Sequence, residues 1–177
     1  MNPTNAEPHS FHINALALNV GTIYFLDSKN IQSQFEKISK TEQTRILNAG
    51  AGITVTNPPA CVAPFRYWRG GGQISNIIAL DKQFCNKFAS EEIFCTILHE
   101  IGHIVNTVPI TRYSDSKIEE YYADDYIRHC GFSTEWSTLL LRLHDEKAIG
   151  FDKPEIKERA MRFINNEPKL INEEALN

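Results

Sequence analysis

The feature that most constrains this chain is the segment SEEIFCTILHEIGHIVN at residues 90–106. Ser90 is a favourable N-cap residue, and Glu91 and Glu92 suit the positive end of a helix dipole. At about 100° per residue, His99, Glu100 and His103 fall on one arc of a helix and the apolar side chains on another. The apolar arc consists of Ile93, Phe94, Ile97, Leu98 and Ile101. We therefore predict a helix that packs through one face and presents two imidazoles and a carboxylate on the other.

Within this helix, HEIGH matches the pattern H-E-x-x-H. Zinc accepts neutral imidazole nitrogens, and two histidines four residues apart can reach one ion. Glu100 would then face the zinc-activated water and serve as general base. The alternative is a solvated helix face that carries two histidines, and a third ligand is what separates the two interpretations.

A second predicted helix, SKIEEYYADDYIRHC at residues 116–130, offers that third ligand. Ser116 and Glu119 have the spacing of a capping box, which gives Glu119 a structural task and leaves Glu120 as the better ligand. Asp124 lies one turn after Glu120 on the same face and can accept a hydrogen bond from a ligating histidine. Asp125 points about 100° away, so we expect it to be solvated.

The rest of the chain predicts an α+β domain, with strands in the first half and helices in the second. Residues 1–14 read as a loose arm and residues 15–177 as one domain. The expected strands are residues 21–27, 52–56 and 73–81. The expected helices are residues 31–47, 134–148 and 154–165, in addition to the two above. The segment CVAPFRYWRGGG at residues 61–72 is expected to be a loop, able to form a lip over a cleft.

Composition limits the classes of partner. A net charge of −4 gives no basic footprint for nucleic acid. The N-terminus has no basic segment typical of a signal peptide, and no apolar run reaches the length of a membrane helix. The four cysteines are far apart in sequence, so we expect reduced thiols and a cytoplasmic protein, with disulfides as the alternative that an even number of cysteines allows.

HEIGH followed by EYYAD resembles the H-E-x-x-H and E-x-x-A-D motifs of gluzincin metallopeptidases, and is similar to minigluzincins and the ImmA/IrrE-like group. The resemblance implies a zincin-like domain with one zinc per chain, held by His99, His103 and Glu120. It also implies that Glu100 is the base, that Asp124 orients the first histidine, and that the substrate is a protein or peptide, such as a regulatory protein. Zincin-like folds place an edge strand of a small mixed sheet along the cleft, and residues 73–81 are expected either to supply it or to form a plain core strand.

One part of the pattern is open, because no downstream residue clearly stabilises the oxyanion. The candidates by residue type or angle are Tyr121, His144, Arg159 and Arg162. This gap leaves a rival function, a zinc-binding regulatory or peptide-binding protein of zincin fold with little or no proteolytic activity. A helical domain without any metal is a further alternative. The sequence does not predict the oligomeric state.

Overall fold

The computed structural model describes residues 11–56, 65–69, 76–105, 116–148, 151 and 153–168. These residues form a 3-10 helix, η1, together with eight α-helices and three strands. In chain order the elements are η1 (Ile13–Leu16), α1 (Val20–Ser28), α2 (Ile31–Phe35), α3 (Lys40–Asn48), β1 (Ala51–Thr56), β2 (Phe65–Arg69), β3 (Asn76–Asp81), α4 (Lys82–Cys85), α5 (Ser90–Val105), α6 (Ser116–His129), α7 (Ser133–Asp145) and α8 (Pro154–Ile164).

The three described strands form a mixed sheet in the order β1-β3-β2. β3 pairs in parallel with β1, where Ile53 faces Ile78, and antiparallel with β2, where Tyr67 faces the same residue. Of the two alternatives for residues 73–81, the edge strand is wrong and the core strand is correct, because β3 is central and β2 lies at the edge. The predicted loop is also wrong over β2. Proline and glycine on either side suggested a loop, whereas the aromatic segment between them has high strand propensity and pairs with β3.

The predicted strand at residues 21–27 is wrong, because α1 occupies this part of the chain. Asn19 caps the helix, since its Oδ1 accepts a hydrogen bond from the Thr22 amide at 2.9 Å. The Thr22 hydroxyl oxygen in turn accepts from the Val55 amide at 3.0 Å, which ties α1 to β1. Phe25 and Leu26 are buried. Capping and docking on the sheet thus outweigh the strand propensity of a β-branched and aromatic segment.

The helical pattern at residues 31–47 is divided between α2 and α3. Ser39 begins α3, because its side chain accepts a hydrogen bond from the Glu42 amide at 3.2 Å. Gly50 has a φ of 70° just before β1. Of the predicted N-terminal arm, residues 1–10 lie outside the described residues, whereas Ile13 is fully buried.

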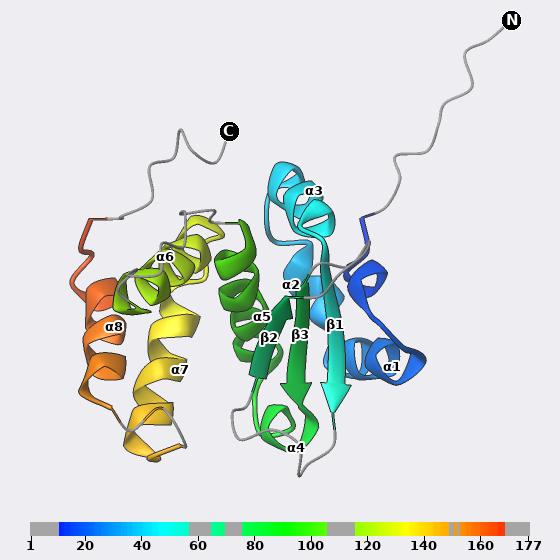
Figure 1. Cartoon of the computed structure of the whole chain (residues 1–177). Helices are drawn as coiled ribbons and strands as arrows, with labels where there is room; N and C mark the ends of the chain where they lie inside the picture. Colours follow the sequence, from blue (N-terminus) through cyan, green and yellow to red (C-terminus); the bar gives the residue numbers. More distant parts are fainter. Residues whose placement is uncertain are drawn as a thin grey trace, which may run out of the picture.

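The predicted helix at residues 90–106 is α5, and its apolar arc is buried in the core. Figure 1 shows α5 between the sheet and the group formed by α6, α7 and α8. Ser90 is the first helical residue and not the cap. Ala89 precedes it, and its amide donates to Glu92 Oε2 at 2.8 Å. Gly102 lets α5 approach α6 closely, because a Cβ there would lie 2.8 Å from Ala123 Cα.

The C-terminal helices lie close to their predicted positions. α6 ends before Gly131, whose φ of 88° favours glycine. Phe132 occupies the N-cap position of α7, which begins at Ser133. Three of the four cysteines, Cys85, Cys95 and Cys130, are buried free thiols, as expected, and Cys61 lies outside the described residues.

The chain therefore combines helices and a mixed sheet, which agrees with the α+β prediction. Among the described helices, none is both long and apolar enough to cross a membrane.

Candidate metal centre

The two histidines of α5 lie one turn apart and face the same space. His99 is buried and His103 is partly buried. The Nε2 atoms of the two rings are 3.2 Å apart. The rings meet edge to face, with an interplanar angle of 83°. The predicted polar arc of the helix therefore aims both imidazoles at one point.

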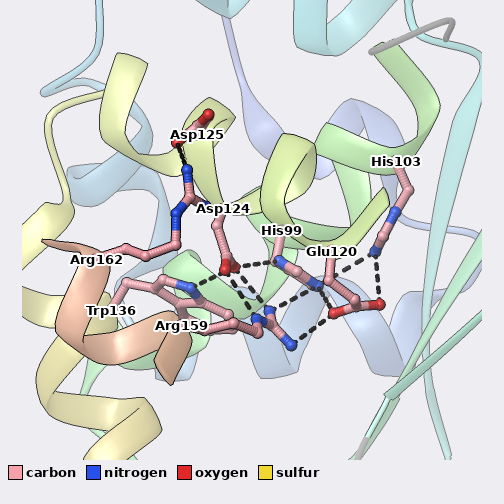
Figure 2. A network of polar contacts seen from close by, with 8 residues as sticks. All are labelled: His99, His103, Glu120, Asp124, Asp125, Trp136, Arg159 and Arg162. Atoms are coloured by element: carbon pink, nitrogen blue, oxygen red, sulfur yellow. Dashed lines mark hydrogen bonds and ion pairs between the residues drawn. The ribbon is translucent and has the colours of Figure 1, made fainter. Parts of the chain in front are cut away.

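Glu120 of α6 completes the group, as Figure 2 shows. Its Oε2 lies 3.2 Å from His99 Nε2, and its Oε1 lies 3.5 Å from His103 Nε2. Among the described residues, these three are the group of His, Cys, Asp and Glu side chains that could hold a metal ion. Two successive helices of the chain thus supply one cluster of donor atoms.

The spacing of these donors can be compared with what a metal ion requires. Four bonds of about 2.0 to 2.1 Å in tetrahedral geometry place the ligand atoms roughly 3.3 Å from one another. The two Nε2 atoms are 3.2 Å apart, and each lies near a different oxygen of Glu120, at 3.2 Å for His99 and 3.5 Å for His103. With one ligand atom taken from each residue, the three atoms lie within 4.8 Å of one another. Two imidazole nitrogens and one carboxylate oxygen also form a donor set that zinc accepts. The residues present therefore fit a zinc ion with three protein ligands.

Glu100 follows His99 on α5 and is buried. Burial raises the pKa of its carboxyl group, while the nearby His99 and His103 act in the opposite direction. The balance leaves the pKa above its usual value. A carboxylate with a raised pKa is better suited to hold a proton taken from water.

Asp124 lies on the His99 side of the centre and is fully buried. Its Oδ1 is 3.3 Å from His99 Nδ1, just beyond the ordinary hydrogen-bond range. Arg159 of α8 donates to both carboxylate oxygens, from Nε to Oδ2 at 2.8 Å and from Nη2 to Oδ1 at 2.7 Å. Burial alone would raise the pKa of Asp124, but Arg159 and His99 hold it at about 2. Asp124 is therefore an ionised partner beside the first histidine.

Arg159 also reaches the ligand side of the centre. Its Nη1 lies 2.6 Å from Glu120 Oε2, and its Nη2 lies 3.5 Å from His99 Nε2. Burial would raise the pKa of Glu120, but hydrogen bonds with His103 and His99 hold it well below its usual range. Of the four oxyanion candidates, Arg159 is the one that contacts the predicted ligands.

The other candidates have different partners. Arg162 Nη2 lies 3.4 Å from Asp125 Oδ1, and its guanidinium lies over the ring of Tyr121. The Tyr121 hydroxyl donates to Glu158 Oε1 at 2.5 Å. His144 Nδ1 lies 3.3 Å from the carboxylate of its neighbour, Asp145.

Two further expectations concern α6. Asp125 was expected to be solvated, which is wrong, because it is fully buried beside Arg162. Helical angle alone does not show that α8 covers this face of α6. The predicted capping box depends on the Ser116 side chain, which lies outside the described part of the structure.

Trp136 of α7 is a member of the centre that sequence reasoning missed. Its Nε1 donates to Asp124 Oδ1 at 2.8 Å, and its ring stacks on His99. The available signal was weak. A buried indole needs a hydrogen-bond acceptor, but nothing in the spacing of α7 identifies which one.

Comparison with known proteins provides no relative for this centre. No protein-family model matches the chain, no curated protein matches it, and no solved structure matches it.

Proposed function

We propose that this chain is a zinc-dependent metalloendopeptidase of the gluzincin type, with one Zn²⁺ held by His99, His103 and Glu120. The observation that carries the proposal is the convergence of their ligand atoms at separations of 3.2 to 3.5 Å. Zinc bound by these residues supplies Lewis acidity toward a peptide carbonyl and toward the attacking water.

Glu100 is the proposed general base. Its carboxylate takes one proton from the attacking water as the water oxygen bonds to the carbonyl carbon. The same proton then passes to the nitrogen of the breaking C–N bond, so the amine leaves neutral and Glu100 returns to its starting state. Burial of Glu100 supports this role, because it raises the pKa of the carboxyl group.

The edge of the sheet supports an extended peptide as substrate. The outer edge of β1 already has partners, since the Leu18 amide donates to Ile53 O at 2.8 Å and the Val55 amide donates to Thr22. β2 forms the opposite edge and has β3 as its strand partner within the described residues. A peptide added to β2 gains main-chain hydrogen bonds whatever its sequence. A bound peptide should therefore slow amide hydrogen exchange in β2, and protection confined to other segments would contradict this placement.

The metal is tested first, by elemental analysis of protein purified without added metal. We expect about one zinc per chain, lost in a His99→Ala/His103→Ala variant. An unaltered protein that contains no metal, even after zinc is supplied, would end the proposal.

The hydrolytic step is tested next with Glu100→Gln, which keeps the size of the side chain and removes the base. We expect it to retain zinc and lose cleavage of a protein substrate. Full cleavage activity in this variant would contradict the mechanism.

One observation favours the rival function, a zinc-binding regulatory or peptide-binding protein. Arg159, the oxyanion candidate at the centre, is held by Asp124 and Glu120. For a binding protein, unaltered protein and Glu100→Gln would bind a partner peptide equally well, and neither would produce cleavage fragments.

A further inference from the structure

Trp136 contacts the predicted ligand His99 directly. The centroids of the two rings are 5.0 Å apart and their planes differ by 24°. Both residues are buried, so this stack lies in the interior and not at a mobile surface. The indole therefore restrains the plane in which the imidazole can lie.

Trp136 also contacts His99 through a shared partner. Its Nε1–H donates to Asp124 Oδ1 at 2.8 Å, and the same oxygen lies 3.3 Å from His99 Nδ1. Figure 2 shows the indole and the imidazole converging on this carboxylate. One side chain thus holds both the ring and the group that orients the ring.

Arg159 and Trp136 make different contributions to this carboxylate. The guanidinium contacts both oxygens of Asp124 and also Glu120, so it supplies charge to the whole centre. The indole is neutral, and among the three predicted ligands it stacks on His99. Removing its N–H leaves the charge pairing of Asp124 intact and changes mainly the orientation.

We propose that Trp136 is a positioning residue of the metal centre, which sets the ring plane of His99 and the position of Asp124 so that Nε2 points toward the ion. This inference depends on the proposed zinc site. Groups that orient a metal-ligating histidine typically change metal affinity 10- to 100-fold when they are removed.

The test compares two variants that each lose one buried donor to a carboxylate. Trp136→Phe keeps an aromatic ring against His99 and removes the hydrogen bond to Asp124. Tyr126→Phe, the matched control on α6, removes a buried hydrogen bond to Glu42 Oε2, which is 3.0 Å long. Zinc dissociation constants are measured by competition with a chromophoric chelator. The visible bands of the Co²⁺-substituted proteins report the ligand geometry, and urea denaturation after EDTA treatment reports stability.

We expect Trp136→Phe to raise the zinc dissociation constant at least about tenfold and to change the Co²⁺ bands. Tyr126→Phe should leave the zinc dissociation constant and the Co²⁺ bands unchanged, even where it destabilises the protein as much as Trp136→Phe does. Unchanged zinc affinity and Co²⁺ bands in Trp136→Phe would overturn the positioning role while leaving the zinc site in place. Equal changes in both variants would also overturn it, because they would reflect general destabilisation. If the unaltered protein binds no zinc, both proposals fail.

A second measurement leaves Trp136 in place, in case its replacement prevents folding. The chain has two tryptophans, so Trp68→Phe leaves Trp136 as its single indole. Its fluorescence should change when zinc binds and recover when EDTA removes the metal. Stoichiometric zinc binding with no change in fluorescence would contradict the inference.

Discussion

Replacing Arg159 with methionine should strongly destabilise the protein, even with no metal present. The guanidinium is buried, and it is paired with Asp124, which is fully buried as well. Methionine keeps much of the apolar stem and removes the charge. The substitution leaves the buried Asp124 carboxylate without its guanidinium partner, and it also removes the ion pair of Arg159 with the more exposed Glu120.

The magnitude can be estimated in two ways. Burial raises the pKa of Asp124, but the charge of Arg159 and its hydrogen bonds lower it from 3.8 to about 2. At about 1.36 kcal/mol for each pKa unit, this fall corresponds to roughly 2.5 kcal/mol of stability. Truncating one member of a buried ion pair costs about 3 to 5 kcal/mol. The cost of truncation is larger because the pKa shift describes Asp124 with its guanidinium in place, whereas truncation removes that guanidinium from a buried carboxylate. The expected loss of stability for Arg159→Met is therefore about 3 to 5 kcal/mol.

The pH dependence follows from the direction of the shift. Because the folded-state pKa is depressed, Asp124 contributes stability above pH of about 4 and loses it as the pH falls toward about 2. Without Arg159, burial raises the pKa of Asp124, so acidification lets this group take up a proton. The difference between the unaltered protein and Arg159→Met should therefore be largest near pH 7 and smaller near pH 4.

The assay is urea denaturation in EDTA at several pH values, so that loss of metal contributes nothing to the comparison. Near pH 7 we expect a loss of about 3 to 5 kcal/mol, or roughly 10 °C in melting temperature. Lys37→Met is the control. It removes an exposed ion pair with Glu91, whose charged atoms are 3.7 Å apart, and should cost less than about 1 kcal/mol. A loss of less than 1 kcal/mol for Arg159→Met, or one that does not shrink at pH 4, would refute the reasoning.

Further predictions concern the packing of α5 and the binding of zinc. Gly102→Ala should destabilise the protein by about 1 to 3 kcal/mol in urea denaturation, because the new Cβ would lie 2.9 Å from the Ala123 carbonyl oxygen. Alanine ordinarily stabilises a helix interior by about 1 kcal/mol, so a stability gain would show that α5 and α6 are not this close. Zinc binding near pH 7.5 should release about one proton, counted by calorimetry in buffers of different ionisation enthalpy. Burial lowers the pKa of His99, but contacts with Asp124 and Glu120 raise it to about 9, so the imidazole must lose a proton before it binds zinc. Zinc binding without proton release would contradict the raised pKa. The EDTA-treated protein should also lose stability as the pH rises toward 9. A histidine whose pKa is raised in the folded state contributes its full stability below its unfolded pKa of 6.5, and this stability is lost as the pH passes its folded pKa.

Local patterns predicted the helices that matter most for the centre. His99 and His103 lie one turn apart on α5, and Glu120 and Asp124 lie one turn apart on α6, so helical periodicity alone places each pair on one face. The positions of α7 and α8 were also predicted, because their apolar spacing and end signals are local properties of the chain.

Non-local features were predicted poorly. The segment of α1 has strand propensity, and its helical state depends on docking against β1 through Thr22. The central position of β3 depends on which strands pair, and a single strand does not specify its partners. The burial of Asp125 depends on α8, which follows it at a distance in sequence and brings Arg162 against it.

Helical periodicity in the sequence was enough to place histidines and carboxylates on the polar faces of two amphipathic helices, because side-chain direction along a helix repeats every 3.6 residues. Only the tertiary structure decided that these faces meet, with His99 and Glu120 separated by 3.2 Å. The same packing brought Trp136 and Arg159 to Asp124 from two other helices. The physical reason is that periodicity sets the direction of a side chain within its own helix, whereas contacts between helices depend on how the whole core packs.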